Sequence, residues 1–277
     1  MAVYRETDGN IVREYALEDG CSPFRKQTEK ALLELVPTKE YGIALFLDGE
    51  LQFAEKDEYI YHESLVHPCL MTAGQRKKVC ILGGGDGCAA REVLKWPDVE
   101  QITIIDWDKE VTDLFTRQQA HLNGWSLTDS RVTIENKNVQ ELLHDERKYD
   151  CIIVDLLDPK EKEIDLWYDI LFLIQVWIEP TGSVVINAGG ITPWQVDMTN
   201  WLLQMIESKM DFRRVLYKAF VPSFAREWSF VLLSKNATIQ SRYLPVRLPL
   251  RLKYFDNITW DHIYTYTWTK DYFLYKN

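Results

Sequence analysis

The chain contains few cysteines and no long apolar run. Its five cysteines are scattered and include no C-x-x-C pair, so the sequence predicts neither a disulfide framework nor a zinc site. No stretch reaches the roughly 18 uncharged apolar residues that a membrane span needs. The first ten residues, MAVYRETDGN, lack the basic and apolar blocks of a signal peptide. We therefore expect a cytoplasmic protein that does not insert into a membrane.

Basic residues are also scarce, with 32 lysines and arginines against 42 acidic residues and a net charge of −10. This balance argues against a general nucleic-acid binder, which needs a basic surface. It is compatible with a cationic ligand, because an acidic surface raises the local concentration of cations. A charge that only keeps the protein in solution explains the balance equally well.

From Lys77 onward, apolar runs typical of β-strands alternate with helical stretches. The runs are KVCILGG, QITIID, RVTIEN, YDCIIVD and SVVINAG, and we expect helices at about 87–96, 108–122, 138–145, 164–178 and 193–209. This alternation predicts a mostly parallel sheet covered on both faces. Two later runs, 212–222 and 228–235, leave no room for a helix and predict an edge hairpin. The expected fold is α/β, with a Rossmann-like seven-stranded sheet of the methyltransferase type.

The first 56 residues follow a different pattern. Short apolar segments alternate there, and Asp48-Gly49 lies between two of them as a hairpin turn would. We expect a small antiparallel β domain over 1–56 and a catalytic domain over 57–277, which opens with a helix at 57–71. Aromatic residues crowd the tail from 254 to 277, which suits a buried or subunit-facing surface; an unusual ligand site is the alternative.

The strongest local motif is ILGGGDGCAAREVLK, at 81–95. A strand ends in glycines and a helix follows directly, so the backbone can pass close to a ligand at the end of the first strand of the sheet. The spacing matches neither G-x-G-x-x-G nor a P-loop, which disfavours NAD and ATP. Asp86, inside the glycine turn, favours a cationic ligand over a phosphate.

Polar side chains also end the next two strands. Asp106 follows about twenty residues after the glycine turn, where an acid holds the two hydroxyls of a ribose. Asn138 comes after the third strand, at the height of an adenine amino group. Each residue alone is commonly a turn residue or a helix cap, but together with the glycine turn they outline a nucleoside pocket.

The fourth strand ends at Asp155, and Asp158 follows after two leucines. Both acids and Asp86 are expected to converge on one cavity, where clustered carboxylates need a cation or a proton. A structural network with buried lysines is the alternative interpretation, but these loops contain no lysine before Lys160.

These motifs resemble the polyamine aminopropyltransferases, the spermidine and spermine synthase family. The resemblance runs from about Tyr41 to Lys235 and rests on five blocks: LDGELQFAEKDEYIYHESLVHP, ILGGGDGCAAREVLK, IDWDKEV, YDCIIVDLLDP and VPSFAREWSFVLLSK. It implies transfer of the aminopropyl group of decarboxylated S-adenosylmethionine, as co-substrate, to an amine such as putrescine. Methylthioadenosine would be released, and no metal or further cofactor would be needed.

The resemblance also assigns roles to residues. On the donor side, Asp106 would hold the ribose, and Asn138 and Val139 would contact the adenine. His62 and Asp86 would lie along the aminopropyl arm. On the acceptor side, Asp155 would be the base, assisted by three contacts: Gln52, Tyr61 and Asp158. Two other activities stay open, a polyamine N-methyltransferase using intact S-adenosylmethionine and a non-catalytic polyamine or nucleoside sensor. We also expect a homodimer.

Several residues depart from the family pattern. The usual D-S-S-D-P is D-L-L-D-P here, because Leu156 and Leu157 replace two serines. The remaining departures are Asp106 for glutamate, Asn138 for aspartate, Ala188 for glutamine, Phe224 for tyrosine, and no match near Lys30-Ala31 for an N-terminal glutamine. The far acceptor end is thus less polar, so putrescine is not a necessary acceptor.

Overall fold

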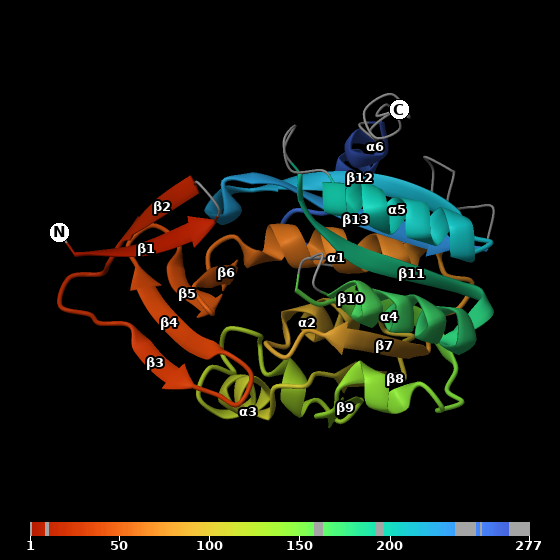
Figure 1. Ribbon diagram of the computed structural model, residues 1–277, viewed down its shortest axis with the longest axis horizontal. Helices are drawn as coiled ribbons and strands as arrows, with labels where there is room; N and C mark the ends of the chain where they lie inside the picture. Colours follow the sequence, from red (N-terminus) through yellow and green to blue (C-terminus); the bar gives the residue numbers. More distant parts are fainter. Residues whose placement is uncertain are drawn as a thin grey trace.

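The computed structural model describes residues 2–8, 11–157, 163–191, 197–235, 248–249 and 251–265. Two antiparallel sheets come first and gather at one end of the molecule (Figure 1). Their strands are β1 (Val3–Asp8), β2 (Ile11–Ala16), β3 (Phe24–Gln27), β4 (Leu32–Thr38), β5 (Gly42–Leu47) and β6 (Glu50–Ala54). The predicted turn between β5 and β6 is confirmed, since Asp48 and Gly49 both have positive φ angles, 49° and 80°, as the favoured two-residue hairpin turn requires.

A seven-stranded sheet forms the rest of the fold. In chain order its strands are β7 (Lys78–Gly83), β8 (Gln101–Ile105), β9 (Val132–Glu135), β10 (Tyr149–Asp155), β11 (Ile178–Ile191), β12 (Arg213–Val221) and β13 (Arg226–Ser234). Their spatial order is β12-β13-β11-β10-β7-β8-β9. The first five are parallel, and β12 and β13 form the predicted antiparallel hairpin at one edge.

Helices cover both faces of this sheet. They are α1 (Glu58–Thr72), α2 (Cys88–Leu94), α3 (Lys109–Arg117), α4 (Ile164–Trp177), α5 (Asp197–Lys209) and α6 (Asn257–Thr265), with short 3-10 turns η1 (Ser126–Thr128), η2 (Val139–Leu142) and η4 (Pro222–Phe224). Alternate residues of each strand enter opposite cores. Ile81 and Ile153 pack with α1 to α3, whereas Leu82 and Val154 pack with α4 and α5. Among the described residues, no helix is both long and apolar enough to cross a membrane.

Two predicted helices are shorter than expected. The stretch 138–145 forms only the turn η2, because its buried apolar residues, Val139 and Leu142, are spaced for a single turn. The helix expected over 108–122 ends at Arg117. The chain then turns around the buried Asn123, whose amide donates to the carbonyls of Phe115 and Asp86. The helix predicted at 57–71 is confirmed as α1.

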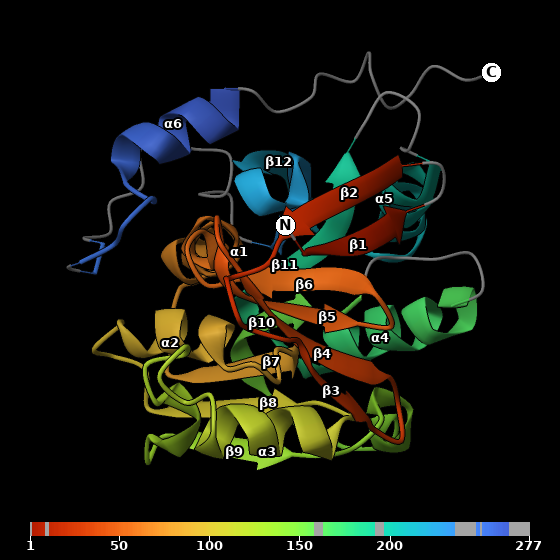
Figure 2. The same cartoon turned by 90° about the vertical axis from the view of Figure 1, so that its left-hand side faces the viewer.

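The N-terminal four-stranded sheet contacts helix α3, which covers the parallel sheet. The Thr28 hydroxyl donates to Asp108 at 2.7 Å, and Lys26 pairs with Glu110 at 2.9 Å, so the β3–β4 hairpin is attached to the start of α3 (Figure 2). Both parts also share one apolar core. The antiparallel strands nevertheless end at Ala54, just before α1 begins, and on that basis we propose the division of the chain at residues 56 and 57.

The aromatic tail is described only in part. Phe255 and Trp260 are buried in the core that lies on the α1 side of the sheet. For these two residues, the aromatic tail forms the buried surface that its composition predicted. Residues 266–277 lie outside the described part of the chain.

Candidate active site

The candidate site lies at the carboxyl ends of β7, β8 and β10. The strand order reverses between β7 and β10, and ligands of open α/β sheets bind at such a switch point. The first glycines of the turn after β7 let the chain pass against β10. A Cβ built on Gly83, whose φ is +83°, would lie only 2.0 Å from the carbonyl oxygen of Asp155. Glycine is therefore required where these two strands end together.

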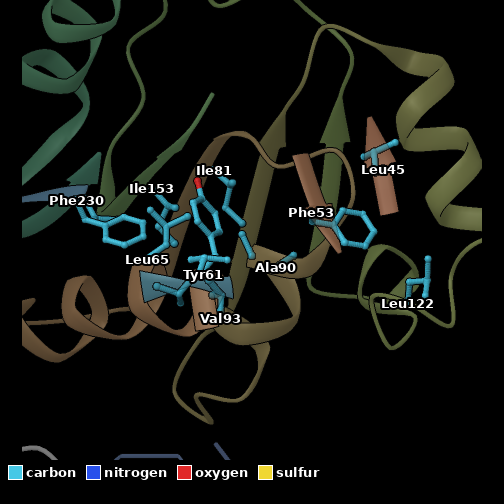
Figure 3. Packing of buried hydrophobic residues seen from close by; sticks show 14 of the residues in the cluster. Leu45, Phe53, Tyr61, Leu65, Ile81, Ala90, Val93, Leu122, Ile153 and Phe230 are labelled. Carbon is cyan, nitrogen blue, oxygen red and sulfur yellow. The ribbon is translucent and has the colours of Figure 1, made fainter. Parts of the chain in front are cut away.

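Helix α1 presents Tyr61 to this point. The Tyr61 hydroxyl donates a 2.7 Å hydrogen bond to Oδ1 of Asp155. Its ring rises from α1 among apolar side chains that include Ile153 and Phe230, with the hydroxyl at the far end (Figure 3). Phe230, Phe224 and Trp228 surround the ring at centroid distances of 5.4, 6.1 and 6.3 Å. The packing therefore fixes the direction in which the hydroxyl meets Asp155.

His62, the next residue of α1, is buried between carboxylates. Its Nδ1 lies 2.8 Å from Oε2 of Glu58, and its Nε2 lies 3.9 Å from Oδ1 of Asp86. Burial alone would lower the pKa of His62, but the hydrogen bond to Glu58 and the charges of Asp86, Glu58 and Asp155 outweigh it and raise the pKa to about 9. At neutral pH the imidazole is therefore a cation that faces Asp86.

Glu58 and Arg91 complete this network and were not among the predicted site residues. Arg91 on α2 donates to both oxygens of Glu58, at 2.9 and 2.8 Å, a bidentate geometry that is among the strongest in proteins. Burial opposes ionisation of Glu58, yet the hydrogen bonds and charges of His62 and Arg91 lower its pKa. Glu58 and His62 are four residues apart on one helix face, and that spacing is the signal that could have identified Glu58.

The buried ligand atoms of Glu58, His62 and Cys88 all lie within 4.8 Å of one another, so we tested the cluster as a metal site. The charge of Glu58 is already matched by Arg91 and by the imidazolium of His62. Burial raises the pKa of the Cys88 thiol well above its usual value, and a metal needs the thiolate and neutral imidazole. The donor set therefore favours an ion-pair network.

The acids that face His62 differ in their environments. Burial raises the pKa of Asp155 to about 6, and the charge of Asp86 adds to this, whereas His62 and the Tyr61 hydrogen bond act against it. Asp86 is held in place by the Cys88 amide, which donates to its Oδ1 at 2.7 Å. Asp155 is thus ionised at neutral pH, but it accepts a proton more readily than an exposed aspartate.

Asp106 lies beside the glycine turn, as predicted. The backbone N–H groups of Gly85 and Asp108 donate to its two oxygens at 2.9 and 2.8 Å. Burial raises the pKa of Asp106 to about 6, which these hydrogen bonds oppose. Asn138 caps the turn η2, since its side-chain oxygen accepts a hydrogen bond from the Gln140 amide. This is the helix-cap role that its sequence position also allowed. Val139 is buried next to it.

The structure thus brings together four of the predicted residues, Tyr61, His62, Asp86 and Asp155, with Asp106 on the neighbouring strand. Gln52, on β6, is half-buried and donates to the carbonyl of Glu50 at 3.0 Å, a contact within its own strand. Asp158 lies outside the described residues.

The raised pKa of His62 predicts a pH-dependent stability. Its protonation stabilises the fold fully below the unfolded-state pKa near 6.5, and this contribution of about 3 kcal/mol is lost as the pH rises through about 9. Asp155 and Asp106 are ionised in both states over this range. We expect the free energy of unfolding, measured by urea denaturation, to decrease between pH 7 and pH 9. This decrease should be larger in the wild type than in His62→Gln. Equal slopes would contradict the assignment.

Comparisons with known proteins identify the family of this chain. Residues 58–242 match the family model described as the spermine/spermidine synthase domain. A polyamine aminopropyltransferase from Ralstonia nicotianae is 36% identical over 76% of this chain and 41% of its own length. A thermospermine synthase from Arabidopsis thaliana is 37% identical, over 74% of this chain and 61% of its own length. The chain therefore spans about two fifths of the length of two such bacterial relatives.

Solved structures show the same fold. A spermidine synthase in complex with the transition-state analogue AdoDATO superposes with a TM-score of 0.85, at 21% identity, over 98% of this chain and 94% of its own. The spermidine synthase from Thermotoga maritima gives 0.80, also at 21% identity, over 95% of this chain and 91% of its own. With the family model covering most of its length, the chain belongs to the spermine/spermidine synthase family.

Proposed function

We propose that the protein transfers the aminopropyl group of decarboxylated S-adenosylmethionine to an amine acceptor. The observation that carries this proposal is the pairing of Tyr61 with Asp155 at the end of β10, opposite His62 and Asp86 at the end of β7. One carboxylate is thereby available to each of two cationic substrates at the same edge of the sheet. The named activities of the relatives support the same reaction.

In the proposed complex, the donor lies along the ends of β7, β8 and β9. Asp106 holds the ribose hydroxyls, while Asn138 and Val139 contact the adenine. His62 and Asp86 line the aminopropyl arm, so that Asp86 attracts its terminal ammonium. The carbon next to the sulfonium is already activated for displacement, and the protein needs only to present an amine in line with the carbon–sulfur bond.

The acceptor enters from the Asp155 side. Its amine is protonated at neutral pH, so Asp155 first attracts the ammonium and then takes its proton. The freed lone pair of the nitrogen attacks the carbon of the arm that is bonded to the sulfonium, the carbon–sulfur bond breaks, and its electrons leave with methylthioadenosine. Tyr61 orients the Asp155 carboxylate, and Gln52 and Asp158 are proposed as further acceptor contacts.

The direct test is to incubate the protein with decarboxylated S-adenosylmethionine and a panel of di- and triamines, and to identify the products by mass. Methylthioadenosine together with a longer polyamine is the expected result. In a parallel incubation with intact S-adenosylmethionine and the same amines, adenosylhomocysteine would instead indicate methyl transfer. Binding of donor and amine without any product over hours would indicate a sensor.

Replacing Asp155 tests the proposed base. Asp155→Asn should lower turnover by about 10²–10⁴, the usual contribution of a positioned general base, and leave donor affinity nearly unchanged. Because the pKa of Asp155 is about 6, wild-type kcat/KM should fall as the pH drops through that value. Asp150→Asn is the matched control, since Asp150 lies at the opposite end of β10. Wild-type turnover in Asp155→Asn would remove this residue from the mechanism.

Replacing Asp86 tests how the site distinguishes the two forms of the donor. Intact S-adenosylmethionine carries an extra carboxylate beside the amino group, and Asp86 would repel it. At about 4–5 Å and an effective dielectric near 20, this contact costs roughly 3–4 kcal/mol before screening, or about a hundredfold or more in affinity. We expect Asp86→Asn to weaken the decarboxylated donor and to narrow the ratio of the two dissociation constants, measured by calorimetry. An unchanged ratio would show that shape, not charge, excludes the carboxylate.

We also propose a cytoplasmic homodimer. All five cysteines are unpaired, as is usual in a reducing compartment. The N-terminal sheets expose Val3, Val12 and Phe24, with exposed fractions of 42%, 59% and 45%, and such apolar surface suits a subunit contact. Light scattering should give twice the 32.6 kDa of one chain. A single-chain mass at micromolar concentration would contradict the dimer.

A further inference from the structure

Asn187, a buried residue of β11, joins three separate parts of the structure. Its Oδ1 accepts from the indole Nε1 of Trp228 at 2.8 Å and from the Gly189 amide at 3.0 Å. Its Nδ2 donates to the carbonyl of Leu156 at 2.9 Å. The orientation of the amide follows from its partners, because an indole N–H only donates and a backbone carbonyl only accepts.

The backbone of β11 is shaped to place this side chain. The register between β11 and β13 shifts between Asn187 and Gly189, and Gly189 has a φ of +84°. The extra residue, Ala188, is held by a hydrogen bond from Thr199 to its carbonyl, at 3.0 Å. Bulges of this kind redirect a side chain and are frequent beside active sites.

On one side, Asn187 fixes an aromatic wall. The Trp228 ring packs on Phe224 with centroids 4.4 Å apart, and both rings contact Tyr61. A separation of 4.4 Å leaves no room for a group between the two rings, so they form a packed surface. Trp228 itself is only half-buried.

On the other side, Asn187 holds the chain that leaves β10. Leu156 directly follows Asp155, and its carbonyl is the group bound by the Asn187 amide. One side chain thus links the position of Trp228 to the position of the backbone that carries Asp155. Tyr61 contacts both Trp228 and Asp155, so it connects the same two parts of the site directly.

We propose that Asn187 is a positioning residue that sets acceptor choice, by locking the Trp228 indole and the Leu156 carbonyl in one arrangement beside Asp155. This role rests on the proposed aminopropyl transfer. The acceptor class that fits is an alkyl amine whose reacting nitrogen meets Asp155 while its methylene chain lies against Trp228. Phe224 and Tyr61, whose rings contact Trp228, make this side apolar, so the site measures the length of the hydrocarbon.

Two variants separate the parts of the device. Trp228→Phe removes the indole N–H together with the five-membered ring and keeps a six-membered aromatic ring, whereas Asn187→Ala removes all three hydrogen bonds. Trp177→Phe is the matched control, since its indole donates to the Asp145 carbonyl at 2.9 Å on the other face of the sheet. Each protein is assayed at saturating donor with linear primary diamines of increasing length, from diaminopropane to diaminohexane. Donor affinity is measured separately by calorimetry.

We expect Asn187→Ala to raise the KM for the best diamine about ten- to a hundredfold, as loss of substrate alignment does, and to flatten the dependence on chain length. Trp228→Phe should also raise the KM for the best diamine and flatten the dependence of activity on chain length. Donor affinity should stay within about twofold in both variants. The double variant should be little worse than Asn187→Ala alone, because coupled residues are not additive. Trp177→Phe should retain the wild-type length dependence.

The outcomes distinguish this role from the proposed function. A wild type that makes no methylthioadenosine with any amine overturns the proposed function, and this role with it. A wild type that turns over, with both variants keeping its KM values and length preference, overturns the role of Asn187 alone. Equal losses of donor and acceptor affinity would also overturn it, since they would indicate a general structural effect.

Discussion

The candidate site depends on the balance of charge around one buried carboxylate, that of Glu58. It accepts two hydrogen bonds from Arg91 and lies within hydrogen-bond distance of His62. Without the guanidinium, the buried acids on this side of the sheet would repel one another and take up protons. With it, the imidazolium of His62 can face Asp86 while both remain charged. Removing either partner of such a pair leaves an uncompensated buried charge, which is far more costly than the pair itself is stabilising.

The same helix interface continues this pattern away from the site. Glu92 on α2 is held by His67, Arg91 and Lys95, and its pKa is about 2 because these contacts outweigh the effect of burial. Glu63 on α1 accepts three backbone N–H groups from residues 253–255, each at 2.8 Å. The helix that carries Tyr61 and His62 is therefore held by hydrogen-bonded carboxylates, Glu63 on α1 itself and Glu92 on the neighbouring α2. Such networks specify one arrangement when every member is satisfied.

Much of the fold could be predicted from the sequence, because strand and helix periods are local signals. The five parallel strands, the edge hairpin and the convergence of Asp86, Asp106 and Asp155 at one edge follow from that alternation. The partners of those residues do not. Arg91 reaches Glu58 across 33 positions, and Trp228 reaches Asn187 across 41. No spacing rule covers contacts between separate elements, so only the folded chain shows which polar groups meet.

The two halves of the site differ in how they are held, and this difference bears on selectivity. On the proposed donor side, Asp106 and Asp86 are fixed by backbone N–H groups, which no side-chain substitution removes. On the proposed acceptor side, the wall formed by Trp228 and Phe224 depends on one amide, that of Asn187, and on packed rings. A site of the first kind keeps one ligand, because its charges and directions are set by the fold. A site of the second kind changes its ligand when a single side chain changes, since shape provides the discrimination. Of the departures from the family pattern, Phe224 lies on that second side, because its ring packs against Trp228 and Tyr61.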